Sequence, residues 1–125
     1  MNPMDQEKYN VKAHQFVEKA QKKLKGGVFK NMFTSKNERI DEGLENYRKA
    51  IDNYKLAKNW MECALINLEC AKLADIQKET RESAIYRSEA GGFFLKANEM
   101  EQGVAAYKHA IEDFKELGNF EQVNL

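Results

Sequence analysis

Apolar side chains recur with helical spacing along nearly the whole chain, and no segment alternates polar and apolar residues as a strand does. This pattern predicts helices at residues 5–25, 38–57, 60–77, 81–97 and 100–117, and the start of a sixth at Phe120. Links of two or three residues join most of them, and such short links place neighbouring helices antiparallel. We therefore expect an all-α fold built from helical hairpins.

Short polar motifs mark the ends of these helices. Gly26 and Gly27 are expected to close the first helix, because glycine readily adopts the left-handed backbone conformation found there. Ser35 with Glu38 forms a capping box for the second helix. Thr80 is a weaker cap for the fourth. Three further N-caps are predicted where an Asn stands three residues before a Glu or Gln, at Asn59, Asn98 and Asn119.

An internal repeat supports a stacked architecture. Residues 40–60 (IDEGLENYRKAIDNYKLAKNW) overlay residues 100–120 (MEQGVAAYKHAIEDFKELGNF) without a gap, at an offset of 60. The pattern Gly-x3-Tyr-x2-Ala-Ile-x2-Tyr/Phe resembles the second helix of a tetratricopeptide repeat, and residues 84–97 resemble the first. The period is not 34, and no Pro closes the units. The resemblance implies hairpins stacked as a tetratricopeptide-like, right-handed solenoid with longer and less regular repeats.

Two helices carry signs of tight packing. The helix at 60–77 is apolar on more than one side, which is typical of a helix sandwiched between layers. Gly91 and Gly92 lie in mid-helix, where each costs about 1 kcal/mol relative to Ala. Either a neighbouring helix approaches closely at this point, or the helix breaks.

Charge refines this picture. The 125 residues contain 20 Lys+Arg and 20 Asp+Glu, and the zero net charge argues against a nucleic-acid-binding protein. The 42% hydrophobic and 32% charged content is that of a globular chain, either one domain or a piece of a larger array. Residues 1–39 nevertheless carry nine Lys/Arg against four Asp/Glu, whereas residues 40–125 carry eleven against sixteen. The first third is therefore positive.

Little in the sequence indicates catalysis, a metal or a cofactor. His14 and His109 are solitary, and acidic pairs such as Glu112-Asp113 are expected on solvated helix faces. Cys63 and Cys70 lie about 10 Å apart on one helix, beyond disulfide reach, so we expect two buried free thiols in a reducing cytosol. The sequence contains neither a membrane-spanning stretch nor a signal peptide. We expect no enzyme activity.

The segment between the first two helices stands apart. Four bulky apolar residues fall within six positions, at Val28, Phe29, Met32 and Phe33, and six Lys but no acid lie between residues 19 and 37. Apolar side chains beside lysines are typical of a reversible contact with an anionic membrane surface, to which Lys25 and Lys30 would contribute. The alternative is that these apolar residues fold back onto the helices. We call residues 26–37 the apolar loop.

The chain resembles the N-terminal part of the soluble NSF attachment proteins, the alpha type more than the gamma type. The likeness rests on GVFKNMF at 27–33, IDE at 40–42 and KLAKNW at 55–60, which matches the family signature K-x-A-K-N-W. In addition, AGGFFLKA at 90–97 resembles the family's AGNAFKKA, and LGNF at 117–120 its M-G-R-F. Most of the chain, from about Met4 onward, is covered.

This resemblance implies a function without catalysis. Members of the family are twisted sheets of antiparallel helices followed by a C-terminal bundle. They coat assembled SNARE four-helix bundles and recruit the hexameric AAA ATPase NSF, which takes the bundle apart. The resemblance carries the membrane contact to the apolar loop, where Val28 replaces the first of two adjacent aromatic residues. It carries basic SNARE contacts to Lys58 and Lys96, whereas Asn119 stands where the family pattern has Arg.

The implied role is therefore an adaptor in vesicle fusion, cytoplasmic and peripheral on membranes. Residues 1–125 would form the SNARE- and membrane-contacting part of the domain, since the resemblance places the NSF-recruiting surface in a C-terminal part absent here. The chain is then either a fragment or a truncated relative that binds SNAREs without recruiting the ATPase. The alternative is a generic tetratricopeptide-like scaffold that binds a peptide. An array cut at this point leaves its last hairpin uncovered, so we also expect self-association or marginal stability.

Overall fold

The computed structural model describes the backbone of residues 1–27 and 32–123 and the side chains of residues 1–27 and 32–118. Its described elements are the helices α1 (Pro3–Lys25), α3 (Lys36–Leu56), α4 (Trp60–Ile76), α5 (Thr80–Lys96) and α6 (Met100–Val123). The chain divides into two compact units, residues 1–59 and 60–125, which are described separately. The prediction of an all-helical chain is confirmed for the described residues, whereas the right-handed solenoid stays a prediction.

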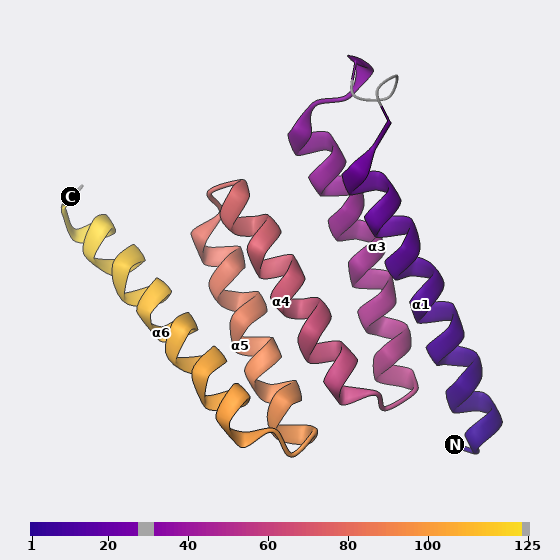
Figure 1. Cartoon of the computed structure of the whole chain (residues 1–125). Helices are drawn as coiled ribbons and strands as arrows, with labels where there is room; N and C mark the ends of the chain where they lie inside the picture. Colours follow the sequence, from indigo (N-terminus) through magenta and orange to yellow (C-terminus); the bar gives the residue numbers. More distant parts are fainter. Residues whose placement is uncertain (28–31, 124–125) are drawn as a thin grey trace. The chain divides into compact units, whose positions relative to one another are not determined.

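The first unit is a hairpin of α1 and α3, which lie side by side (Figure 1). Asn2 caps α1 by accepting a hydrogen bond from the Asp5 backbone N–H at 2.9 Å. At the other end, Gly26 adopts a φ of 58° and donates its N–H to the Lys22 carbonyl, as the sequence predicts. Ser35 caps α3 by accepting from the Glu38 N–H at 3.1 Å, which confirms that cap.

A glycine permits the close approach of these two helices. A Cβ on Gly43 would lie 2.7 Å from Leu24 side-chain carbons of α1, so the Leu24 side chain occupies the space that glycine leaves open. Tyr47, Ala50 and Tyr54 continue the buried face of α3. The hairpin end is also fixed by a hydrogen bond of 3.0 Å from the Asn59 side-chain amide to Asn10 Oδ1.

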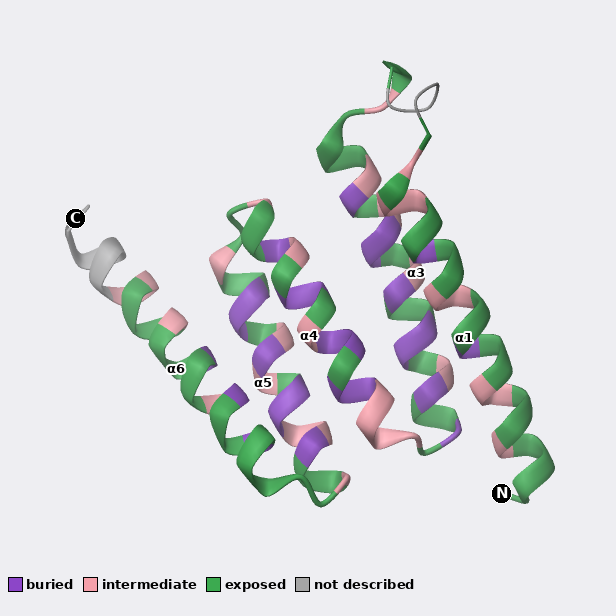
Figure 2. Ribbon diagram, viewed as in Figure 1, coloured by how far each residue is buried: buried purple, intermediate pink, exposed green. Residues whose placement is uncertain are grey.

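The second unit consists of α4, α5 and α6, with α5 between the other two (Figure 1). Figure 2 shows that buried positions are frequent in α4 and α5, whereas most described positions of α6 are exposed. One buried cluster joins all three helices, and Met61, Leu68 and Phe93 pack against it; its members are Ala64, Ala90, Phe94 and Ala106. Cys63 and Cys70 are buried free thiols, as predicted.

The glycine pair in α5 is explained by its neighbour. The helix runs without a break through Gly91 and Gly92, so the alternative of a helix break is wrong. A Cβ on Gly91 would lie 2.8 Å from the Tyr107 ring, and one on Gly92 would lie 3.2 Å from its hydroxyl. The aromatic side chain of α6 therefore fills the space above both glycines.

Several predicted boundaries are wrong. Asn98 does not cap α6, because that helix starts at Met100 and Asn98 instead adopts a left-handed φ of 63° after the end of α5. Thr80 is the first residue of α5, and the preceding Glu79 makes no side-chain cap. No sixth helix starts at Phe120, since α6 continues to Val123. A helical glycine such as Gly118 costs only about 1 kcal/mol, less than the backbone hydrogen bonds that a break would remove.

Candidate functional site

Three features are candidates for a functional site: the apolar loop, the lysines assigned to partner contacts, and a charged cluster in the second unit. Of the loop residues, Val28, Phe29 and Lys30 lie outside the described residues. Met32 and Phe33 have helical backbone, whereas a loop was expected, and α3 starts two residues earlier than predicted, at Lys36. Their side chains are 73% and 71% exposed. These two residues therefore do not fold back as a plug on the helices.

Positive charge accompanies this exposed apolar pair. Lys22, Lys23 and Lys25 occupy the last turn of α1, next to the loop, where they also complement the negative end of the helix dipole. Lys23 pairs with Glu42 of α3 at 3.7 Å. No helix in the described part of the chain is long and apolar enough to cross a membrane.

The two lysines assigned to a partner lie in different units. Lys58 is exposed in the turn after α3 and has a left-handed backbone, with φ at 57°. Lys96 is the exposed last residue of α5. Its Nζ lies 4.6 Å from the centroid of the Trp60 ring and 5.9 Å from that of Phe93. Lys96 therefore has a specific aromatic environment, which the sequence did not reveal.

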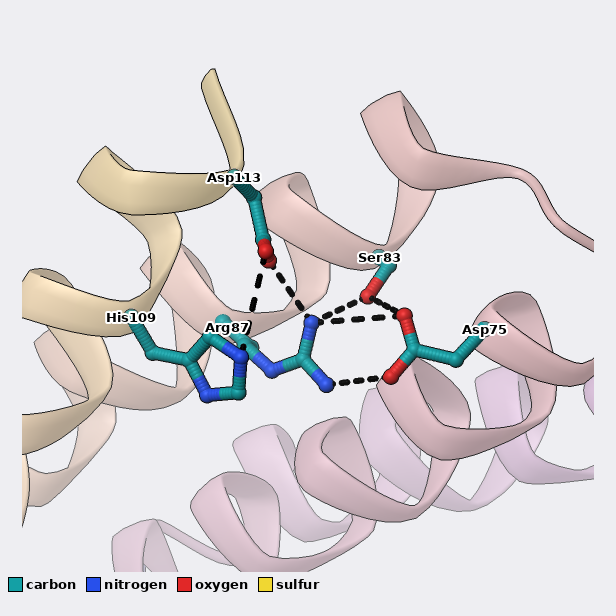
Figure 3. Close-up of polar contacts among 5 residues, drawn as sticks. All are labelled: Asp75, Ser83, Arg87, His109 and Asp113. Carbon is teal, nitrogen blue, oxygen red and sulfur yellow. Dashed lines mark hydrogen bonds and ion pairs between the residues drawn. The ribbon is translucent and has the colours of Figure 1, made fainter. Parts of the chain in front are cut away.

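A charged cluster joins the three helices of the second unit (Figure 3). Arg87 of α5 donates hydrogen bonds to Asp75 of α4 and to Asp113 of α6, the latter at 2.7 Å. Ser83 accepts from Arg87 and donates to Asp75, so its hydroxyl links the two charged side chains. His109 Nε2 lies 3.8 Å from Asp113 Oδ1 at the edge of the cluster.

Burial makes this cluster costly to break. The Arg87 side chain is 8% exposed and that of Asp113 is 15% exposed, so the expectation that Asp113 lies on a solvated face is wrong. Burial by itself would raise the pKa of Asp75, but the hydrogen bonds from Arg87 and Ser83 and the Arg87 charge outweigh it and lower that pKa. For Arg87, burial is likewise outweighed by Asp75 and Asp113, and its pKa is raised.

The cluster is structural rather than catalytic in its chemistry. The Arg87 guanidinium binds two carboxylates and a hydroxyl, and His109 remains solvent-exposed as predicted. No group of three or more potential metal ligands occurs among the residues described. Sequence reasoning missed the cluster because its members lie 12 and 26 residues apart. Only the register of three packed helices brings them together.

Comparison with known proteins assigns the chain to a family of helical proteins. The family model described as "Soluble NSF attachment protein, SNAP" matches residues 11–124. The chain belongs to the soluble NSF attachment protein family. No solved structure matches it significantly.

Individual members of the family are distant in sequence. A beta-soluble NSF attachment protein from Bos taurus is 29% identical over 119 residues, covering 94% of this chain and 39% of the relative. Alpha-soluble NSF attachment proteins from Homo sapiens and Mus musculus are each 27% identical over 119 residues, covering 94% of this chain and 40% of the relative. The chain thus spans about two fifths of these relatives, and the identities do not separate the alpha from the beta type.

Proposed function

We propose that this chain is the SNARE- and membrane-contacting part of an alpha-type attachment protein. It binds assembled SNARE complexes at a cytoplasmic membrane surface as part of an adaptor through which NSF is recruited for their disassembly. The observation that carries the proposal is the family match over residues 11–124, which includes the apolar loop and both predicted contact lysines. The role is that of an adaptor without catalysis, on helical hairpins stacked as a right-handed solenoid.

The membrane contact is supported by the exposed pair Met32 and Phe33, which follows the lysines at the end of α1 closely in the sequence. Burying a Phe side chain contributes about 1.5–3 kcal/mol, and each lysine near an anionic surface adds about 1 kcal/mol. The sum gives reversible attachment. The undescribed residues Val28, Phe29 and Lys30 are part of the same proposed contact.

Liposome flotation tests the membrane contact. The wild-type chain is expected to float with vesicles that contain phosphatidylserine and to remain in solution with phosphatidylcholine alone. The double variant Met32→Ser/Phe33→Ser should bind the anionic vesicles about tenfold more weakly, since it loses most of the apolar term. Met4→Ser/Val11→Ser is the matched control, because it removes two exposed apolar side chains from α1, outside the apolar loop. Equal flotation of both double variants would contradict the proposal.

A pull-down on an assembled SNARE four-helix bundle tests the partner. Lys58→Glu and Lys96→Glu each reverse the charge of an exposed side chain at a helix end. Each is expected to weaken capture, most strongly at low ionic strength, where exposed charges are least screened. Lys72→Glu serves as the control on α4, because Lys72 is 69% exposed and already pairs with Glu69. No capture by the wild-type chain would rule out the proposed function.

A further inference from the structure

An aromatic shelf lies at one end of the second unit. Trp60 is the first residue of α4 and Phe93 stands in the last turn of α5, so the antiparallel hairpin brings their rings together. The ring centroids are 6.0 Å apart and the ring planes deviate by 10°, which is a stacked pair. Phe93 also packs against the buried cluster around Phe94. The shelf is therefore anchored to the core while both rings remain partly exposed.

Lys96 rests on this shelf. Its ammonium lies within cation–π distance of both rings, at 4.6 Å from Trp60 and 5.9 Å from Phe93. Lys23, Lys49 and Lys72 each have a carboxylate of the chain within 3.7 Å. Lys96 has no ion-pair partner among the residues that the structure describes. A carboxylate partner would accept hydrogen bonds from the ammonium N–H groups of Lys96, whereas an aromatic ring face leaves most of them unbonded. These donors therefore remain available to an incoming anion.

A second donor lies in the same place. The indole N–H of Trp60 makes no hydrogen bond within the described residues, and Asn67 Oδ1 is the only buried side-chain N or O atom there without a partner. The indole N–H therefore reaches solvent. An ammonium and an indole N–H beside one another are two donors that a single carboxylate accepts well.

We propose that Trp60 and Phe93 are positioning residues that hold Lys96 ready for a carboxylate on the acidic face of a helical protein bundle. This inference rests on the proposed function. It identifies Lys96, held by the rings of Trp60 and Phe93, as a residue that contacts the SNARE bundle. Holding the lysine in place before binding lowers the side-chain entropy lost in the complex. Tryptophan at an interface centre is also a frequent source of binding energy. The competing explanation is that Lys96 merely complements the helix dipole at the end of α5.

The single tryptophan of the chain provides a direct readout, because all intrinsic indole fluorescence comes from Trp60. The probe is an assembled SNARE four-helix bundle whose own tryptophans are replaced by Phe. Titration of the wild-type chain with this bundle is expected to shift or quench the Trp60 emission in parallel with binding measured by calorimetry. Binding without any change in the emission would overturn the inference and leave the proposed function in place. No binding would overturn both.

Variants separate positioning from helix stability. Lys96→Met is expected to weaken calorimetric binding about tenfold, the loss of one charge-assisted hydrogen bond. Trp60→Leu, which keeps an apolar side chain but removes the ring, should weaken it about threefold. Combined with Lys96→Met, the effect of Trp60→Leu should be clearly smaller than in the wild-type background, because part of the role of Trp60 is to position that lysine. Full additivity of the two losses would overturn the positioning role.

Lys72→Met removes one positive charge from the same unit and is expected to leave binding nearly unchanged. Thermal unfolding of each variant is followed by circular dichroism. Lower melting temperatures for Lys96→Met and Trp60→Leu with wild-type affinity would assign the shelf a structural role only and overturn the inference. Equal losses of affinity for Lys96→Met and Lys72→Met would overturn it as well, since they would show an effect of net charge alone.

Discussion

Arg87 connects both of its neighbouring helices through carboxylates on either side of α5 (Figure 3). A guanidinium with five N–H donors in a planar fork can reach both carboxylates at once, which a lysine cannot do with the same geometry. Because the Arg87 side chain is buried, removing either of its carboxylates leaves part of its charge uncompensated, which destabilises the fold. The cluster therefore fixes the relative register of α4, α5 and α6.

The lowered pKa of Asp75 predicts a specific acid sensitivity. A carboxyl whose folded-state pKa lies below its unfolded value of about 3.9 stabilises the fold above that pH, and the contribution is lost as the pH falls through the folded pKa. We expect Asp75→Asn to lower the melting temperature near neutral pH, and the difference from wild type to shrink below about pH 4. Thermal unfolding at a series of pH values measures this.

Glu69→Gln is the control for that series. Glu69 also lies on α4 and has an exposed partner in Lys72, so its replacement should change the melting temperature little at any pH. A difference between wild type and Asp75→Asn that stayed constant from neutral to acid pH would contradict the prediction.

Glycine positions give a second prediction at the scale of single residues. Gly91→Ala adds a methyl group that would lie 2.8 Å from the Tyr107 ring, and overpacking of this kind costs about 1–3 kcal/mol. The better helix propensity of Ala returns about 1 kcal/mol. We expect net destabilisation of about 1 kcal/mol, measured by urea unfolding.

Gly118→Ala is the matched control, because a Cβ there meets no atom within 4 Å. It should stabilise the chain by up to about 1 kcal/mol. If both substitutions stabilised the chain, the close approach of Tyr107 to α5 would be wrong.

At the scale of helices, the turns after α3, α4 and α5 share one backbone conformation. In each, a residue two positions past the helix end is left-handed, at Lys58, Lys78 and Asn98. The next residue donates its N–H to a carbonyl five residues earlier, from Asn59 to Tyr54, Glu79 to Ala74 and Glu99 to Phe94. These are the bonds of a Schellman motif. The turns recur every 20 residues. The offset of 60 residues between the two repeated segments therefore corresponds to three helices.

The shared backbone conformation predicts a stabilising substitution. Lys78 adopts a φ of 61°, a conformation that costs a residue with a Cβ about 1 kcal/mol. Lys78→Gly removes this cost, and part of the gain is offset by the greater freedom of glycine in the unfolded chain. We expect a net gain of about 0.5 kcal/mol in the free energy of unfolding. Chemical denaturation of the variant measures it.

Lys72→Gly is the control for this substitution, since Lys72 lies inside α4, where glycine should destabilise by about 1 kcal/mol. Opposite signs for the two lysines are the expected result. Destabilisation by Lys78→Gly would show that its left-handed conformation carries no strain.

The turn geometry also explains why some helix ends are predicted correctly from the sequence and others are not. Gly26 and Ser35 are read correctly because each acts on its own helix through local hydrogen bonds. Asn98 misleads because Asn is favoured both as an N-cap and in the left-handed position after a helix, and the Glu three residues later does not distinguish the two. The contacts of Lys96 were not predicted either, since the pairing of Trp60 with Phe93 depends on hairpin register.

At the scale of the whole molecule, the zero net charge conceals two regions of opposite sign. The positive first third includes the lysines at the end of α1, beside the exposed Met32 and Phe33. In the remainder, acidic side chains are in excess, and part of that excess neutralises Arg87 inside the second unit. Family membership, composition and helical periodicity follow from the sequence, whereas the chemistry around Arg87 and Lys96 requires the three-dimensional register.

The described part of α6 exposes an apolar stripe that predicts self-association. Met100, Val104, Ile111 and Phe114 are 68%, 42%, 52% and 41% exposed and fall on one side of the helix. A hollow lined by Met100, Val104 and Ala105 lies on the same surface. An exposed stripe of this kind favours association, and the same face of a second copy is an available apolar partner.

Sedimentation velocity over a range of concentrations measures this association. The sedimentation coefficient of the wild-type chain should rise with concentration, whereas Val104→Glu/Ile111→Glu should remain a monomer at every concentration. Val11→Glu is the control, because Val11 is 47% exposed on α1, outside the stripe. It should associate as the wild type does. If the wild-type chain does not self-associate, we expect a low melting temperature instead, because the apolar stripe then remains exposed to water. A concentration-independent monomer with a high melting temperature would contradict the prediction.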